Sequence, residues 1–105
     1  MLYVVWEFRV KTARRREFEQ HYSATGTWAR FFRKGRGYRG TVLLHDRRRP
    51  ARYLTIDRWD SLAAYHRFRR RNHKHYDALD KQFQRLTKKE TCLGYFATAG
   101  RTTRR

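Results

Sequence analysis

Cysteine, proline and acidic residues are scarce in this sequence of 105 residues, which has one cysteine, one proline and nine Asp and Glu residues. A single cysteine, Cys92, can form neither an internal disulfide nor a zinc site built from cysteines. We therefore expect it to be a small buried apolar residue. The longest strictly apolar run covers only residues 1–6, whereas a membrane span needs about 20 residues. No leader with a charged and then an apolar segment is evident, so the sequence predicts a cytoplasmic protein that does not enter a membrane.

Several common catalytic motifs are also missing. Gly35 and Gly37 lack the third glycine of a phosphate-binding loop and precede a predicted strand rather than a helix. No serine lies in a nucleophile elbow, no Cys and His pair has a suitable context, and no acidic dyad is closely spaced in the sequence. Asp77 and Asp80 lie one helical turn apart, but the basic residues around them favour a solvated ion-pair face. We predict no metal site.

Positive charge is abundant, because 27 Lys and Arg residues against nine Asp and Glu residues leave a formal net charge of +18. Such an excess is typical of proteins that bind nucleic acid or another anion. The basic residues occur in short clusters spread along the chain, however, and most of them are arginine. We therefore interpret the charge mainly as an arginine-rich solvated surface, with an anionic small ligand and nucleic acid as the less favoured readings.

Hydrophobic periodicity predicts the first half of the fold. Residues 2–10 carry apolar side chains at every even position, which predicts a strand. Aromatic residues then recur every three or four positions, and this spacing predicts helix over residues 13–34. Gly26 interrupts the stripe, and a glycine inside a helix costs about 1 kcal/mol relative to alanine. The segment is therefore expected to form two short helices or one bent helix.

The second half repeats this order with a hairpin inserted. Residues 38–46 and 52–59 are predicted as strands, and the short charged turn between them makes an antiparallel hairpin. A second stripe over residues 62–86 predicts helix, with a break near residues 72–73, where the stripe turns polar. Residues 91–99 are expected to form the last strand.

The order strand, helix, strand, strand, helix, strand is the split βαβ arrangement of the ferredoxin-like α+β fold. This arrangement predicts a four-stranded antiparallel sheet with its helices on one face. One domain is expected over residues 1–99, followed by a basic C-terminal tail at residues 100–105 that is expected to be flexible.

The predicted sheet is apolar on both faces. Tyr3 and Val5 share a face opposite the even-numbered residues of the first strand, and Leu54 and Ile56 alternate with Tyr53 in the third. A second copy of the sheet is the simplest cover for the face that the helices leave bare. We therefore expect a homodimer in which two sheets meet and close into a dimeric α/β barrel. Nucleic acid is then an unfavoured partner, because the sheet surface that RNA-binding versions of the fold use is occupied.

A resemblance to a known family is carried by segments that combine aromatic residues with glycines, and by the tryptophan that ends the third predicted strand before Ser61. These segments are FEQHY at 18–22, GTWARFF at 26–32, GYRGT at 37–41, RYLTIDRW at 52–59 and LGYF at 93–96. Over residues 2–97 the chain resembles the antibiotic biosynthesis monooxygenase family of the dimeric α+β barrel superfamily. The resemblance implies the same dimeric barrel.

The resemblance also implies an activity. The family includes oxygenases that act on polycyclic aromatic compounds without a cofactor, heme-degrading enzymes, and members with no established activity. We expect a cofactor-independent monooxygenase acting on an aromatic or phenolic small molecule, with a ligand site between the sheet and the helices of each subunit. The candidate substrate-binding residues are Tyr22, Trp28, Phe32, Tyr65 and Tyr76.

Oxygenation without a cofactor requires a base to deprotonate the substrate and a cation to hold the resulting anion. His66 is the candidate base, with His21 as an alternative, because imidazole titrates near neutral pH. Arg30, or alternatively Arg58, is the candidate cation. Trp59 is the third candidate catalytic residue, because it could stack on a flat substrate.

Two other functions remain open in the sequence. The heme-degrading relatives use an Asn, a Trp and an axial His, and only the Trp has a counterpart here, Trp59; Glu7 and Arg69 occupy the other two positions. Heme therefore fits the sequence poorly, and exposure of His73 and His75 is the simpler interpretation of these histidines. The remaining alternative is a dimeric, non-enzymatic protein that binds an anionic aromatic molecule or heme.

Overall fold

A computed structural model describes residues 1–100 of the chain. Two helices follow the first strand, a hairpin comes next, and two further helices precede the last strand. Short 3-10 turns lie at Thr12–Arg14 and Gln84–Leu86. The elements are β1 (Leu2–Val10), α1 (Arg15–Tyr22), α2 (Thr27–Phe32), β2 (Tyr38–His45), β3 (Arg52–Trp59), α3 (Leu62–Arg71), α4 (His73–Phe83) and β4 (Thr87–Ala97).

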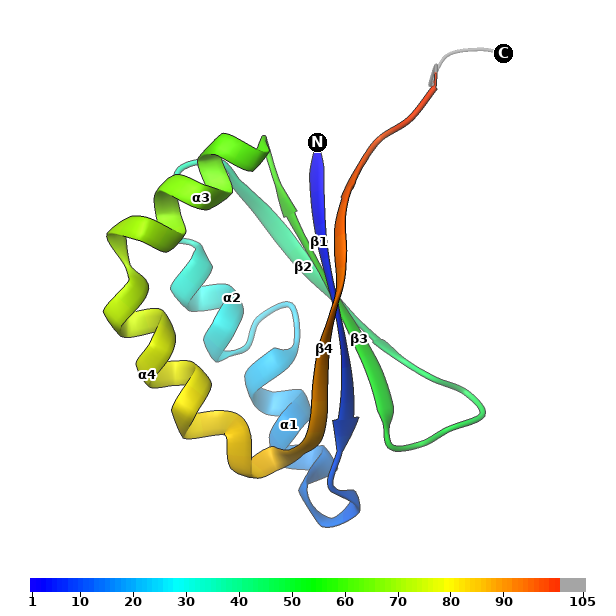
Figure 1. The fold of residues 1–105 in the computed structure, drawn as a ribbon. Helices are drawn as coiled ribbons and strands as arrows, with labels where there is room; N and C mark the ends of the chain where they lie inside the picture. The colour runs from blue at the N-terminus through cyan, green and yellow to red at the C-terminus, as the bar shows by residue number, and fades with distance from the viewer. Residues whose placement is uncertain (101–105) are drawn as a thin grey trace.

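The strands form one antiparallel sheet in the order β2-β3-β1-β4. Within residues 1–100, the four helices cover the same face of this sheet and the opposite face carries no helix (Figure 1). The ferredoxin-like α+β fold predicted from the sequence is therefore confirmed. No helix in the described part of the chain is long and apolar enough to cross a membrane. The predicted tail lies outside the described residues from position 101 onward.

The predicted interruption of the first helical segment is also confirmed. Gly26 lies between α1 and α2, where an added Cβ would come 2.6 Å from the carbonyl oxygen of Gln20. Only glycine allows this close approach of two backbone segments. The second helical segment breaks at Asn72, as predicted, and the Asn72 side chain donates to the carbonyl oxygen of Phe68 over 3.0 Å.

The last strand differs from its prediction. It begins at Thr87 rather than at residue 91 and ends at Ala97 rather than at residue 99. Residues 87–90 are polar and show no alternation, but Arg9 pairs with Lys89 and Phe8 with Glu90 in the β1–β4 ladder. The pairing partner, rather than local hydrophobicity, therefore determines where β4 begins. Cys92 is exposed rather than buried, because β4 is an edge strand.

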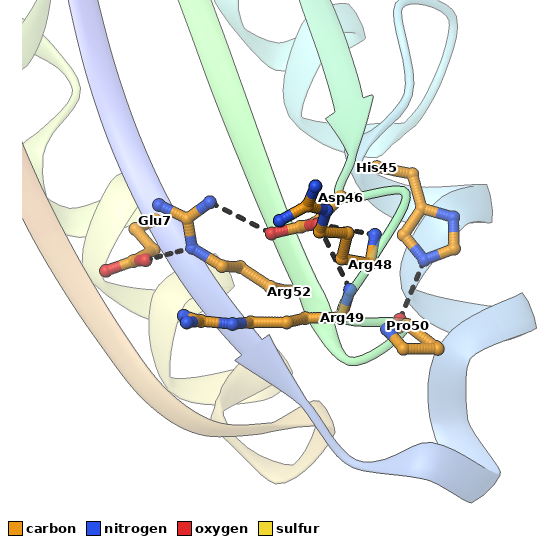
Figure 2. A network of polar contacts seen from close by, with 7 residues as sticks. All are labelled: Glu7, His45, Asp46, Arg48, Arg49, Pro50 and Arg52. Carbon is orange, nitrogen blue, oxygen red and sulfur yellow. Dashed lines mark hydrogen bonds and ion pairs between the residues drawn. The ribbon is translucent and has the colours of Figure 1, made fainter.

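The β2–β3 hairpin is held by the Asp46 carboxylate. This carboxylate accepts the backbone N–H groups of Arg48 and Arg49 over 2.7 and 3.1 Å, which lowers the pKa of Asp46. Arg52 links the hairpin to β1, because its guanidinium contacts both Asp46, at 3.2 Å, and Glu7 (Figure 2). The ion pair connects the two strands on the side of the sheet away from the helices.

Beside this ion pair, the face of the sheet away from the helices carries exposed apolar side chains. Val42 pairs with Ile56 and Leu44 with Leu54 across the β2–β3 ladder, and the side chains of Val42 and Leu44 are 40% and 44% exposed. Phe96, which pairs with Tyr3 across the β1–β4 ladder, is 50% exposed. This surface of residues 3, 42, 44, 54, 56 and 96 is called the bare face below.

The start of α3 is stabilised by a side-chain cap. The Ser61 hydroxyl accepts the backbone N–H of Ala64 over 3.1 Å and caps this helix, and loss of such a cap costs about 1 kcal/mol. We expect Ser61→Ala to lower the free energy of unfolding in urea by about 1 kcal/mol. Ser23→Ala is the matched control, because Ser23 ends α1 through its backbone N–H alone. An equal loss in both variants would contradict the capping role.

Candidate functional site

A cavity lies between the sheet and the helices. Its wall is mainly aromatic, and its volume is about 40 Å³, which is room for about three water molecules. The polar part of its wall consists of Thr41, Thr55 and the carboxylates of Asp57, Asp80 and Glu90. The aromatic part consists of Trp6, Phe8, Tyr22, Trp28, Phe32 and Tyr76.

A wider groove lies outside this inner cavity, between α4 and the start of β4. The groove is open to solvent, its wall is mostly polar or charged, and its volume is about 540 Å³. Trp6, Tyr76, Asp80 and Glu90 line both the groove and the inner cavity. These four residues are called the throat below. The inner cavity can admit only one edge of a ring system, whereas the groove has room for the remainder.

Four of the five predicted substrate-binding residues line the inner cavity. Tyr22, Trp28, Phe32 and Tyr76 come from α1, α2 and α4, and the helical stripe predicted from the sequence brings them to one side. Trp28 and Tyr76 meet edge to face, with ring centroids 5.1 Å apart. Tyr65 does not line the cavity; its ring packs against Trp59 at 5.5 Å.

The three predicted catalytic residues lie outside the inner cavity. His66 is exposed on α3, and Arg30 is exposed on α2, where its guanidinium donates to the Thr25 carbonyl oxygen over 2.7 Å. Trp59 is completely buried and packs against Phe32 at 5.9 Å between ring centroids. The structure does not bring these three side chains together.

The alternative base and cation named from the sequence also lie outside the cavity. His21 has Nδ1 2.7 Å from the Thr27 hydroxyl and its ring 4.3 Å from that of Phe83. Burial lowers the pKa of His21. Arg58 is exposed and donates to the carbonyl oxygen of Arg39 over 2.9 Å.

Asp57 is the most deeply buried of the acidic site residues that were not predicted from the sequence. The residue is 8% exposed, and its carboxylate accepts the Thr41 hydroxyl over 2.6 Å. The hydroxyls of Thr41 and Tyr38 lie 2.5 Å apart, so Tyr38 donates to Thr41 when Thr41 donates to Asp57. Burial raises the pKa of Asp57 to about 6. The sequence did contain a signal for this residue. Asp57 lies on the same strand face as Tyr53 and Trp59, and this alternation predicts a carboxylate that faces the core.

Two further carboxylates lie at the throat. Burial raises the pKa of Glu90, which accepts the Thr87 hydroxyl over 2.9 Å, and of Asp80. The solvated ion-pair face predicted for Asp77 and Asp80 is not formed, because Asp80 is half-buried against the groove and neither residue makes an ion pair with a described residue. Sequence reasoning missed Glu90, because it belongs to the part of β4 that was not predicted as a strand.

Arg69 is the half-buried cation of the outer groove. Its guanidinium lies 3.6 Å from the centroid of the Tyr76 ring and donates to the Tyr65 hydroxyl over 2.8 Å. Lys88 and Lys89 also line this groove. No group of three or more histidine, cysteine or acidic side chains in residues 1–100 is arranged to hold a metal ion.

Comparisons with known proteins agree with this architecture. The sequence model of the antibiotic biosynthesis monooxygenase family matches residues 1–82, which is most of the chain. The chain belongs to this family. A search of curated proteins finds no significant match to the sequence.

Solved structures of the same fold come from several organisms. SnoaB, a cofactor-independent oxygenase from Streptomyces nogalater, is 21% identical, with a TM-score of 0.74 over 98% of this chain and 97% of its own. A Deinococcus radiodurans protein ascribed to the same family is 15% identical, with a TM-score of 0.75 over 100% of this chain and 99% of its own. A conserved Methanosarcina mazei protein is 13% identical, with a TM-score of 0.74 over 93% of this chain and 92% of its own. At these identities the likeness establishes the fold.

The raised pKa of Asp57 generates a prediction about stability and pH. The pKa is 3.8 for an ordinary aspartate and about 6 for the folded protein, so the folded state binds more protons than the unfolded state between these values. The contribution of Asp57 to stability is therefore fully present below about pH 4 and is lost as the pH rises through about 6. We expect Asp57→Asn to raise the free energy of unfolding at pH 7 by up to about 3 kcal/mol, and to have little effect at pH 4.

Urea unfolding between pH 4 and pH 8 measures this difference. Asp77→Asn is the matched control, because it removes the same charge from an exposed position on α4. It relieves only the repulsion of Asp80, so any stabilisation that grows with pH should be much smaller than for Asp57→Asn. An Asp57→Asn variant that is destabilised equally at both ends of the pH range would refute the buried ionised carboxylate.

Proposed function

We propose that this protein is a monooxygenase that needs no cofactor and acts on a phenolic aromatic small molecule. Membership of the antibiotic biosynthesis monooxygenase family supports an oxygenase, and SnoaB, with the same fold, is a cofactor-independent oxygenase. The observation that carries the proposal is the inner cavity, where aromatic rings surround the buried Asp57 carboxylate. Such a cavity holds a flat apolar molecule and offers a base to its hydroxyl group.

Asp57 is the proposed general base. A base works best when its pKa is near the operating pH, and burial raises the pKa of Asp57 to about 6. The hydrogen bond from Thr41 holds one carboxylate oxygen and leaves the other available for the substrate hydroxyl. The inner cavity admits the hydroxyl-bearing edge of the substrate, while its other rings occupy the outer groove.

The substrate supplies the electrons for the reaction. Asp57 takes the hydroxyl proton, and the substrate anion transfers one electron to O₂. The resulting radicals combine into a peroxide anion on the ring carbon, and Asp57 returns its proton to that peroxide. Loss of water, which removes the remaining hydrogen of that carbon and breaks the O–O bond, leaves a carbonyl group; in the keto form of the substrate the same carbon is a CH₂. One oxygen atom enters the product and the other leaves as water. Arg69 lines the outer groove, where the rings over which the substrate anion is delocalised lie, and it is the proposed stabiliser of that charge.

His66, Arg30 and Trp59 stay candidate catalytic residues that the same assay tests. His66 and Arg30 face solvent, and reaching a substrate in the inner cavity would require them to move. Trp59 supports the site indirectly in this proposal, because its buried ring packs against the cavity residue Phe32.

Oxygen uptake with anthrone as substrate tests the proposed base. Loss of a general base lowers a rate by about 10²–10⁴-fold, so we expect a decrease of at least about 100-fold in kcat for Asp57→Asn. Asp60→Asn, which removes a carboxylate paired with Arg39 on the surface, should retain activity. The expected product is anthraquinone, with uncatalysed oxidation subtracted.

Variants at the other candidates separate the two possible bases. Full activity in Asp57→Asn together with its loss in His66→Ala would show that the histidine, and not the carboxylate, is the base. Binding of aromatic compounds without any turnover would instead select the alternative function, a non-enzymatic small-molecule binding protein. An anionic ligand suits the site poorly in either case, because three carboxylates line the inner cavity.

We further propose that the protein is a homodimer in which two bare faces meet. An exposed apolar surface of this extent is typical of an interface, and members of the family are typically dimeric. Analytical ultracentrifugation at micromolar concentration should give twice the 13.0 kDa of one chain. Val42→Lys on the bare face should shift the protein toward monomer, whereas Leu62→Lys on α3, where the native side chain is similarly exposed, should not. A wild-type protein that sediments only as a monomer would refute this arrangement.

A further inference from the structure

The carboxylates of the site differ from most others in the chain because they have no cationic partner. Within residues 1–100, arginine side chains pair with four of the nine acidic residues. The paired residues are Glu7, Glu17, Asp46 and Asp60. None of the three carboxylates of the inner cavity forms an ion pair with a described residue, although the sequence has 27 Lys and Arg residues. The wall of the inner cavity contains no basic residue at all.

The burial and the hydrogen bonding of Asp57 are separate evidence that the inner cavity is a binding site. Its side chain is more than nine-tenths buried and lines the inner cavity. One of its oxygens accepts the Thr41 hydroxyl, and the other has no hydrogen-bond partner among the described residues. A buried charge without a full set of partners is costly, and such groups are concentrated at functional sites.

Aromatic rings stand beside the carboxylates of the throat. Trp6 and Tyr76 line both cavities together with Asp80 and Glu90. The faces of such rings attract cations, and an ammonium group between aromatic rings and carboxylates is bound by both kinds of contact. The charge of Asp80 also raises the pKa of Glu90, so the two carboxylates repel each other and a cation between them would relieve that repulsion.

The cation already present nearby does not fill this position. The Arg69 guanidinium lies over the Tyr76 ring and bonds to the Tyr65 hydroxyl. It forms no ion pair with Asp80 or Glu90 in the described part of the chain. Lys88 and Lys89 line the outer groove, and neither pairs with these two acids. The charge of Arg69 lowers the pKa of Asp80 from a distance, but the two carboxylates of the throat have no direct cationic partner among the described residues.

We propose that the site takes an aromatic molecule that carries a protonated amine, with the ammonium group bound between Asp80 and Glu90 at the throat. This inference deepens the proposed function and rests on it for the use of the same cavity, because it names the class of substrate. The hydroxyl edge of the substrate reaches Asp57 in the inner cavity, and the rings lie in the outer groove. The amine selects the substrate and takes no part in the oxygen chemistry.

Three probes with the same ring system and different charges test this inference by isothermal titration calorimetry. They are 1-naphthylmethylamine, which is cationic at pH 7, the neutral 1-naphthalenemethanol, and the anionic 1-naphthoate. We expect the amine to bind about tenfold more tightly than the alcohol, since one ammonium–carboxylate contact at a partly buried site contributes at least that factor, and naphthoate to bind most weakly. The net charge of +18 alone would favour naphthoate, so the order of affinities is diagnostic.

Variants place the effect at the throat. Asp80→Asn and Glu90→Gln should each reduce the preference for the amine over the alcohol while leaving the affinity for the alcohol unchanged within about twofold. Glu17→Gln is the matched control, because it removes the same charge from a surface residue paired with Arg85, and it should keep the preference. Equal affinity for the three probes, tighter binding of naphthoate, or no binding of the amine at millimolar concentration overturns the inference.

The binding and oxygenation assays can fail separately. Turnover of anthrone by a protein that shows no preference for the amine would overturn the amine site and leave the monooxygenase proposal standing. A preference for the amine that depends on Asp80 and Glu90, in a protein that consumes no oxygen with any hydroxylated aromatic compound, would overturn the monooxygenase proposal and leave the amine site standing.

Discussion

Aromatic packing between the sheet and the helices is the constraint on which the rest of this structure depends. Phe18 and Tyr22 stack at 4.1 Å, and at the other end of the layer Trp59 packs against Phe68 at 5.3 Å. Packing at that end is so close that a Cβ added at Gly35 would lie 2.6 Å from the Phe68 ring and 2.8 Å from the Trp59 ring. The cavity opens where the layer is less complete, beside Trp28 and Tyr76.

The position of the cavity explains why carboxylates rather than histidines line it. Asp57 points into the core because strand alternation places it on the same face as Tyr53 and Trp59. The fold tolerates this buried acid through the chain of hydroxyls from Tyr38 to Thr41 to Asp57. Such a chain stabilises a carboxylate incompletely, and an incompletely stabilised carboxylate is a stronger base. The ionised Asp57 carboxylate thus lowers the stability of the fold at the position where the proposed reaction requires a base.

Sequence reasoning located the elements well, because the signals for them are local. The alternation in residues 2–10 and the aromatic stripe from Phe18 to Phe32 are properties of neighbouring residues, and β1, α1 and α2 follow from them. The same stripe identified Tyr22, Trp28 and Phe32 as residues on one side of the helical layer, and all three line the inner cavity. The predicted start of β4 was wrong, because the first residues of this strand are polar and join the sheet only through their pairing with β1.

The candidate site was only partly predictable, because the type of a residue does not determine whether its side chain reaches a cavity. His66 and Arg30 have suitable chemistry, but the helix faces that carry them point to solvent. Periodicity and the family resemblance by themselves determined the split βαβ order, the aromatic inner surface and an apolar outer face, because these depend on spacing along the chain. Only the tertiary structure decided that Asp57, Asp80 and Glu90 meet at one cavity. They come from β3, α4 and β4, so their meeting depends on the strand order and on how the helices lie across the sheet, and their raised pKa values depend on burial that only the complete fold creates.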